Sequence, residues 1–169
     1  MSQAKAVTRF VFGSTGSVAG TLYGTIVVLA VLAAGGRAFQ DDLWRLVALV
    51  VTTVIVLWLA HVYAHGLAES LDANRRLRPA ELGAVTRREL AIPLAAVVPT
   101  AALVLGAVGV LDGDTAVWLA FGLGVATLAV QGLRYAALEH LGVWGTMAAV
   151  ALNLVLGLVL VGLEVLVSH

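Results

Sequence analysis

Five long apolar runs divide this sequence, and each is close to the length that an α-helix needs to cross a lipid bilayer. They cover residues 18–34, 43–65, 92–111, 115–132 and 143–167. Crossing about 30 Å of hydrocarbon at about 1.5 Å per residue takes roughly 20 apolar residues. Backbone groups in lipid must be satisfied internally, and these runs lack the alternation of barrel strands. The sequence therefore predicts one all-α membrane domain, residues 1–169, built as a polytopic transmembrane bundle of five spans.

Composition supports this class and excludes several others. Apolar residues make up 61% of the chain and charged residues only 12%, against roughly 25% charged in an average soluble domain. The zero formal net charge argues against nucleic acid as a partner, because phosphate binding needs a basic excess. The absence of cysteine excludes disulfides and thiolate metal sites. No cofactor is expected, and the lipid bilayer is the first expected partner.

The basic residues predict how the chain is threaded through the membrane. With a cytoplasmic N-terminus, eight of the ten Lys and Arg residues fall on the inside, namely Lys5, Arg9, Arg75, Arg76, Arg78, Arg87, Arg88 and Arg134. Only Arg37 and Arg45 fall outside, which is a clear positive-inside bias. The first span is expected to be retained, since no signal-peptide cleavage pattern accompanies it. We expect a multi-pass protein of a bacterial inner membrane, with its C-terminus outside.

One polar segment, residues 68–91, interrupts the apolar pattern on the cytoplasmic side. Pro79 suits a first helical position, so a short helix over residues 79–90 is expected to lead into the third span. The arginines of the segment are typical of a topology anchor near anionic headgroups, and a surface that docks lipid or a protein partner is the alternative. A segment this short leaves no room for a separate catalytic domain, which disfavours an enzyme.

Small residues at helical spacing mark the predicted contact faces of two spans. Gly16, Gly20 and Gly24 form one stripe on the first span, and Gly142 and Gly157 belong to a stripe on the fifth. Helices in lipid associate by close backbone approach, so both stripes predict packing between helices, and assembly of several copies is expected. Asn153 lies on the fifth-span stripe near mid-membrane, where its amide is expected to form an interhelical hydrogen bond or to belong to an ion pathway.

The second span carries the strongest candidate for a functional site. His61, His65 and Glu69 follow one another at four-residue spacing and form one polar stripe at the cytoplasmic end of the helix. Two histidines at this spacing can share a metal ion, but Val62 stands where a zinc protease has its glutamate. Histidine also titrates near neutral pH and relays protons.

The fourth span has a similar polar stripe at the same predicted membrane face. Gln131, Tyr135 and Glu139 are four residues apart, with Arg134 on their flank. If the second and fourth spans are neighbours, Arg134 or Glu139 faces the two histidines. The stripes fit interfacial anchoring, a proton or ion pathway through His61, His65, Glu69, Arg134, Glu139 and Asn153, or a metal site at His61 and His65. In the third span, Pro99 is expected to bend the helix.

Two segments carry a resemblance to a known group of proteins. Residues 20–26, Gly-Thr-Leu-Tyr-Gly-Thr-Ile, and residues 57–65, Leu-Trp-Leu-Ala-His-Val-Tyr-Ala-His, together with the Ala/Val/Leu/Gly/Arg-rich composition, resemble small integral membrane proteins of actinobacteria. The resemblance implies a membrane bundle and directs attention to the first two spans. It transfers no activity and no catalytic or ligand-binding residue.

Two functions from different classes remain at this stage. The leading hypothesis is an oligomeric channel or transporter that moves protons or a small cation along the His61, His65 and Glu69 stripe. The alternative is a non-transporting scaffold, which binds other membrane proteins or lipid through its small-residue stripes and the segment 68–91.

Overall fold

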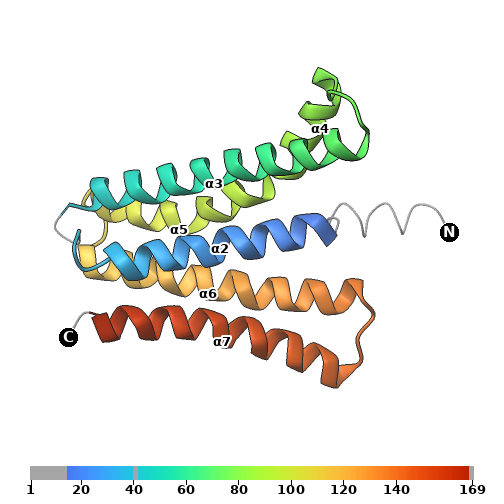
Figure 1. The fold of residues 1–169 in the computed structure, drawn as a ribbon. Coiled ribbons are helices and arrows are strands. Elements are labelled where there is room, and N and C mark those ends of the chain that lie inside the picture. Colours follow the sequence, from blue (N-terminus) through green and yellow to red (C-terminus); the bar gives the residue numbers. More distant parts are fainter. Residues whose placement is uncertain (1–14, 40–41, 168–169) are drawn as a thin grey trace.

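The structure is a computed structural model, and it describes residues 15–39 and 42–167, apart from the side chains of residues 15–17, 163–165 and 167. All regular secondary structure in these residues is helical, which confirms the predicted all-α class. In the labels of Figure 1, the helices are α2 (Thr15–Gly35), α3 (Leu43–Asp72), α4 (Pro79–Arg88), α5 (Ala91–Ala107), α6 (Gly113–Leu138) and α7 (Val143–Val167).

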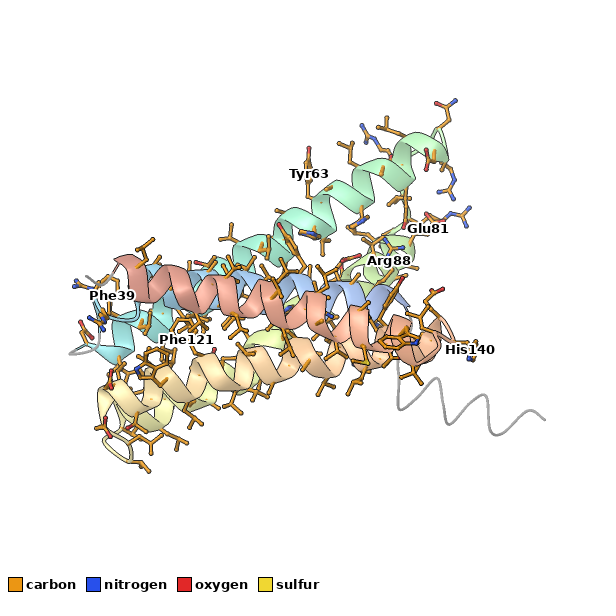
Figure 2. All side chains as sticks on the ribbon, turned by 90° about the horizontal axis from the view of Figure 1, so that it is seen from below. Phe39, Tyr63, Glu81, Arg88, Phe121 and His140 are labelled. Carbon is orange, nitrogen blue, oxygen red and sulfur yellow. The ribbon has the colours of Figure 1, made fainter. Side chains whose placement is uncertain are left out.

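The long helices lie side by side in a bundle, with α2 and α6 at its centre (Figure 1). In the most apolar stretch of α2, and likewise of α6, 44% of the residues are buried inside the bundle, against 17% in α3 and 11% in α7. The core is built from fully buried apolar side chains such as Leu29, Leu32, Leu46, Leu103 and Leu128. Phe121 points into the same interior (Figure 2). The outer helices therefore present large apolar faces outward, as helices do when their surroundings are lipid.

Four helices, α2, α3, α6 and α7, are individually long and apolar enough to span a membrane. The third predicted span is less regular, because α5 has 17 residues and reaches spanning length only with α4, from which it is bent by 40°. This break lies at residues 89–90, whereas α5 continues as one helix through Pro99. The third span therefore ends at Ala107, earlier than predicted, and Gly109 turns the chain with a positive φ of 79°.

Other helix ends also differ from the sequence prediction. The second span was predicted to end at residue 65 and the fourth at residue 132, yet α3 continues to Asp72 and α6 to Leu138. Polar residues end an apolar pattern but not a helix, because the helix can continue beyond the hydrocarbon into water. The short helix predicted over residues 79–90 is α4.

Helix α4 is attached to the extended end of α3 by charged groups. Arg75 binds Glu81 in a bidentate pair, with N–O distances of 2.7 and 2.9 Å, and the Arg78 N–H donates to the same carboxylate at 2.7 Å. These hydrogen bonds, first the one from Arg75 and then the one from Arg78, lower the pKa of Glu81 from 4.5 to about 2. The end of α3 and helix α4 together extend from one end of the bundle (Figure 1).

Two glycines of α2 bring this helix close to α5. A Cβ atom added at Gly24 would lie 2.5 Å from the carbonyl oxygen of Ile92, and one at Gly20 would lie 3.1 Å from the Cβ of Ala91. The close approach positions the start of α5, and the break before it, against the N-terminal half of α2. Gly16 belongs to α2, but its surroundings lie outside what the structure describes.

The predicted glycine stripe of the fifth span divides into two cases. Gly157 packs against α6, because a Cβ there would lie 3.1 Å from Cδ1 of Leu128. Gly142 precedes α7 and has open space around it, with no atom within 4 Å of a Cβ built there, so the prediction that it packs is wrong. The glycine that packs tightly at this end is Gly132 on α6 instead. A Cβ built at Gly132 would lie 2.9 Å from Nδ2 of Asn153 and 2.9 Å from the Cα of Val150, both on α7.

Candidate functional site

Charged and titratable side chains meet in a cavity of about 300 Å³ at the end of the bundle that carries α4. Helix α2 contributes Tyr23, α3 contributes His61 and His65, and α4 ends with Arg88. Glu89 lies in the break between α4 and α5. We call these five residues, with Glu69 beside them, the polar cluster. The close contact of α2 with α5 forms the floor of the cavity at Gly20 and Ile92.

Glu89 is the buried centre of the polar cluster. The residue is only 9% exposed. Its Oε1 atom lies 3.2 Å from Nε of Arg88 and 3.4 Å from Nδ1 of His65. A buried carboxylate remains in a membrane protein only where it is paired or reaches water. Glu89 satisfies this condition through a guanidinium on its own segment and an imidazole on α3.

Arg88 joins the predicted stripe of α3 to this carboxylate. Its NH1 atom donates to Oε1 of Glu69 at 3.0 Å, while its Nε atom donates to Glu89. Glu69 and Arg88 are about half exposed, so this part of the polar cluster faces the outside of the bundle. Figure 2 shows Arg88 at the same end of the molecule as Glu81 and His140.

The two histidines share one orientation, set by the helix itself. Nδ1 of His61 lies 3.1 Å from the carbonyl oxygen of Leu57, and Nδ1 of His65 lies 3.2 Å from that of His61. A carbonyl oxygen only accepts, so each Nδ1 carries the proton of the neutral ring.

Three rings form a series that begins beside the carboxylate and crosses from α3 to α2. The ring centroids of His65 and His61 are 6.0 Å apart, and those of His61 and Tyr23 are 5.0 Å apart. The middle ring, His61, is partly buried, whereas His65 and Tyr23 are exposed. The arrangement can hold a proton at several adjacent groups, and a neighbouring acid and base pair can exchange it.

The structure does not bring the polar stripe of the fourth span to the histidines. Helix α3 packs against α2, α4 and α5, whereas α6 packs against α2, α5 and α7, so α2 lies between the two stripes (Figure 1). Arg134 donates to Oε1 of Gln131 at 3.3 Å, within its own helix, and Glu139 is exposed at the end of α6. The second and fourth spans are therefore not neighbours, and the condition under which Arg134 or Glu139 would face His61 and His65 is not met.

Asn153 is also separate from the polar cluster. It is buried between α6 and α7, with its Nδ2 atom 2.9 Å from the position of a Cβ on Gly132. The predicted interhelical hydrogen bond is not found among the residues that the structure describes, and Asn153 instead lines a cavity beside α2.

The histidine pair does not assemble a metal site. Within residues 15–39 and 42–167, no three His, Asp or Glu side chains are placed so that they could hold one metal ion. The imidazoles of His61 and His65 are tilted by 46° to each other, and both Nδ1 atoms face backbone carbonyls. Four-residue spacing aligned the two residues on one face, but no third ligand stands beside them in the described residues.

Sequence reasoning missed Tyr23 and Glu89 as members of the site. Glu89 was grouped with the charges of the segment 68–91, although it is the last acidic residue before the third span and directly follows an arginine. A carboxylate at the edge of an apolar run was the available signal. Tyr23 offered none, since its role depends on α2 packing beside α3.

Comparisons with known proteins give no relative: no protein-family description, no curated protein and no solved structure matches this chain.

Proposed function

We propose that this protein is a transporter or channel of the bacterial inner membrane, in which the polar cluster is the cytoplasmic entrance for protons or a small cation. The proposal combines a helical bundle able to span a membrane with titratable groups at the end that the positive-inside rule assigns to the cytoplasm. Ionisable groups at membrane depth are costly, and they mark ion pathways more often than they stabilise a fold.

The observation that carries the proposal is the contact between Glu89 and His65. A buried carboxylate 3.4 Å from an imidazole can share one proton with it, and the pair has two charge states that differ by that proton. The charged and titratable groups around the pair are Tyr23 on α2, His61 and Glu69 on α3, and Arg88 at the end of α4. Arg88 keeps the site from becoming strongly negative when Glu89 is ionised.

The opposite half of the bundle is closed by apolar packing. Leu29, Leu32, Leu46 and Leu103 are fully buried there, and Phe121 is 2% exposed. An ion cannot keep its hydration through such a layer. Transport therefore requires a second conformation or a path between copies of the chain, and we include a homo-oligomer in the proposal.

The test is proton flux into liposomes that contain the purified full chain and an internal pH-sensitive dye. A potassium gradient with valinomycin supplies the driving force, and initial rates are measured from pH 5 to 8, where histidine titrates. Glu89→Gln and His65→Ala are expected to reduce the flux to that of protein-free liposomes. His61→Ala tests whether the second ring of the series is also needed for the flux.

The matched control is His140→Asn. His140 is exposed at the same end of the bundle with a φ of 52°, a conformation that asparagine tolerates, so the exchange removes an imidazole without straining the backbone. It should leave the flux unchanged. Wild-type flux no faster than that of protein-free liposomes, or equal flux in wild type, Glu89→Gln and His65→Ala, would refute the proposal.

A scaffold is the second candidate, and the exposed segment 68–91 favours it. This segment extends from the bundle with Arg76 and Arg87 exposed, so it can bind an acidic partner or anionic headgroups (Figure 1). Purification from native membranes without crosslinking separates the two candidates. A stable complex with another protein, lost on Arg76→Ala and Arg87→Ala, would support the scaffold.

A further inference from the structure

A second cavity, of about 620 Å³, lies between α2, α6 and α7. Its walls include Val18, Leu22 and Tyr23 of α2, Tyr135 of α6, and Leu152 and Asn153 of α7. Tyr23 and Ala19 also line the polar cluster's cavity, so the two cavities are neighbours along α2. The volume falls within the roughly 300–1,000 Å³ of pockets that bind small molecules.

Asn153 places an amide in the wall of this apolar cavity. The residue is 7% exposed, and its side chain forms no hydrogen bond with any described residue. A buried amide without a partner is costly, and a leucine would fill the same position without that cost. The packing nevertheless makes room for it, because Nδ2 occupies the space that a Cβ at Gly132 would need.

The chemistry of the walls defines what the amide can bind. The described lining carries no charged side chain, and its polar groups are one amide and the phenols of Tyr23 and Tyr135. A charged ligand would lose its hydration there without gaining a counter-ion. The amide N–H groups and both phenol O–H groups can donate, so the complementary group is a neutral acceptor, such as a carbonyl oxygen.

We propose that this cavity binds a neutral, lipophilic molecule whose carbonyl oxygen accepts a hydrogen bond from Asn153. The route of access is lateral, from the bilayer, because Tyr135 and Leu152 at the cavity are 45% and 63% exposed on the outer surface of the bundle. Two sources supply this chemistry, namely the ester carbonyl of a membrane lipid and the ketone of a free lipophile. The inference does not depend on the proposed proton pathway.

The test is photolabelling of the full chain in nanodiscs made from ether-linked phosphatidylcholine, a lipid without carbonyl groups. The probe is benzophenone, a neutral lipophilic ketone, and the labelled peptides are identified by mass spectrometry. Saturable labelling is expected on the α7 peptide that contains Leu152. Competition with dioleoylglycerol and, separately, with 2-methyl-1,4-naphthoquinone distinguishes an ester ligand from a ketone ligand.

Two variants test the site in different ways. Asn153→Leu removes the donor and should weaken probe binding roughly three- to fifteenfold, the range measured for hydrogen bonds between membrane helices. Ala149→Leu keeps the amide but fills the cavity, and it applies even if the first variant fails to fold. The matched control is Ala101→Leu, which fills an apolar groove of about 660 Å³ between α3 and α5.

Each outcome decides the proposal. The proposal is supported if both site variants reduce the labelling of α7, the control variant does not, and one of the carbonyl compounds competes. The compound that competes then shows whether the ligand carries an ester or a ketone. Labelling that is spread evenly over α3, α5 and α7, or that neither site variant changes, overturns it.

Discussion

Replacing Gly24 by alanine should loosen the contact between α2 and α5 that holds the polar cluster together. The added Cβ would lie 2.5 Å from the carbonyl oxygen of Ile92, whereas a carbon–oxygen contact of this kind normally needs about 3.3 Å. The helices must therefore separate by about 0.8 Å at this point. The atom met belongs to the backbone, so no side-chain rotation relieves the clash.

The expected loss is near the upper part of the roughly 1–3 kcal/mol range for overpacking. The better helix propensity of alanine returns up to about 1 kcal/mol, which leaves a net destabilisation of about 1–2 kcal/mol. Gly122→Ala is the matched control, because a Cβ there meets nothing within 4 Å, and it should be neutral or slightly stabilising. Gly124→Ala should be intermediate, since its Cβ meets the flexible end of Leu29 at 2.7 Å.

The free energy of unfolding of each variant can be measured by titration with sodium dodecyl sulfate in mixed micelles, with helicity followed by circular dichroism. The reasoning predicts the order Gly24, Gly124, Gly122 from most to least destabilised. A Gly24→Ala protein as stable as the Gly122→Ala protein would show that the two helix backbones do not approach as closely as described.

Three further predictions concern other parts of the fold. The folded-state pKa of Glu81 is lowered from 4.5 to about 2, so its contribution to holding α4 is complete above about pH 4.5 and is lost as the pH falls through about 2. Hydrogen exchange of the α4 amides should therefore become faster in this acid range. Glu81→Gln should abolish this pH dependence. Gly132→Ala should cost about 1–3 kcal/mol by pushing Asn153 and the α7 backbone away from α6, measured by the same titration. Leu128→Ala should cost about 2 kcal/mol, the low end for core truncations, because lipid tails accommodate leucine as well as protein does. The exposed Leu133→Ala should change stability little, and equal losses at the two leucines would contradict the assigned core.

The long helices were predictable because a single physical requirement determines them. Satisfying the backbone in lipid demands helices about as long as the hydrocarbon is thick, and α7 has the same limits, residues 143–167, as the fifth predicted span. Helix ends outside the hydrocarbon depend on local hydrogen bonds instead. Hydropathy therefore underestimated the lengths of α3 and α6.

The site was only half predictable for a related reason. The spacing of His61, His65 and Glu69 follows from one helix, so the stripe could be seen in the sequence. The identity of the helix beside it does not follow from periodicity, and the structure places Tyr23 and Glu89 there instead of Arg134 and Glu139. Contacts made by tertiary packing, such as the one between Gly132 and Asn153, cannot be predicted without knowing which helices are neighbours.

The phenol of Tyr23 is a common wall between two compartments of different character, one charged and one apolar. A rotation of this ring that widens one compartment narrows the other. Occupancy on either side then shifts the preferred rotamer for both, and thermodynamic reciprocity requires the two effects to be equal in size. Replacing this tyrosine by a smaller residue would remove the wall and join the two compartments.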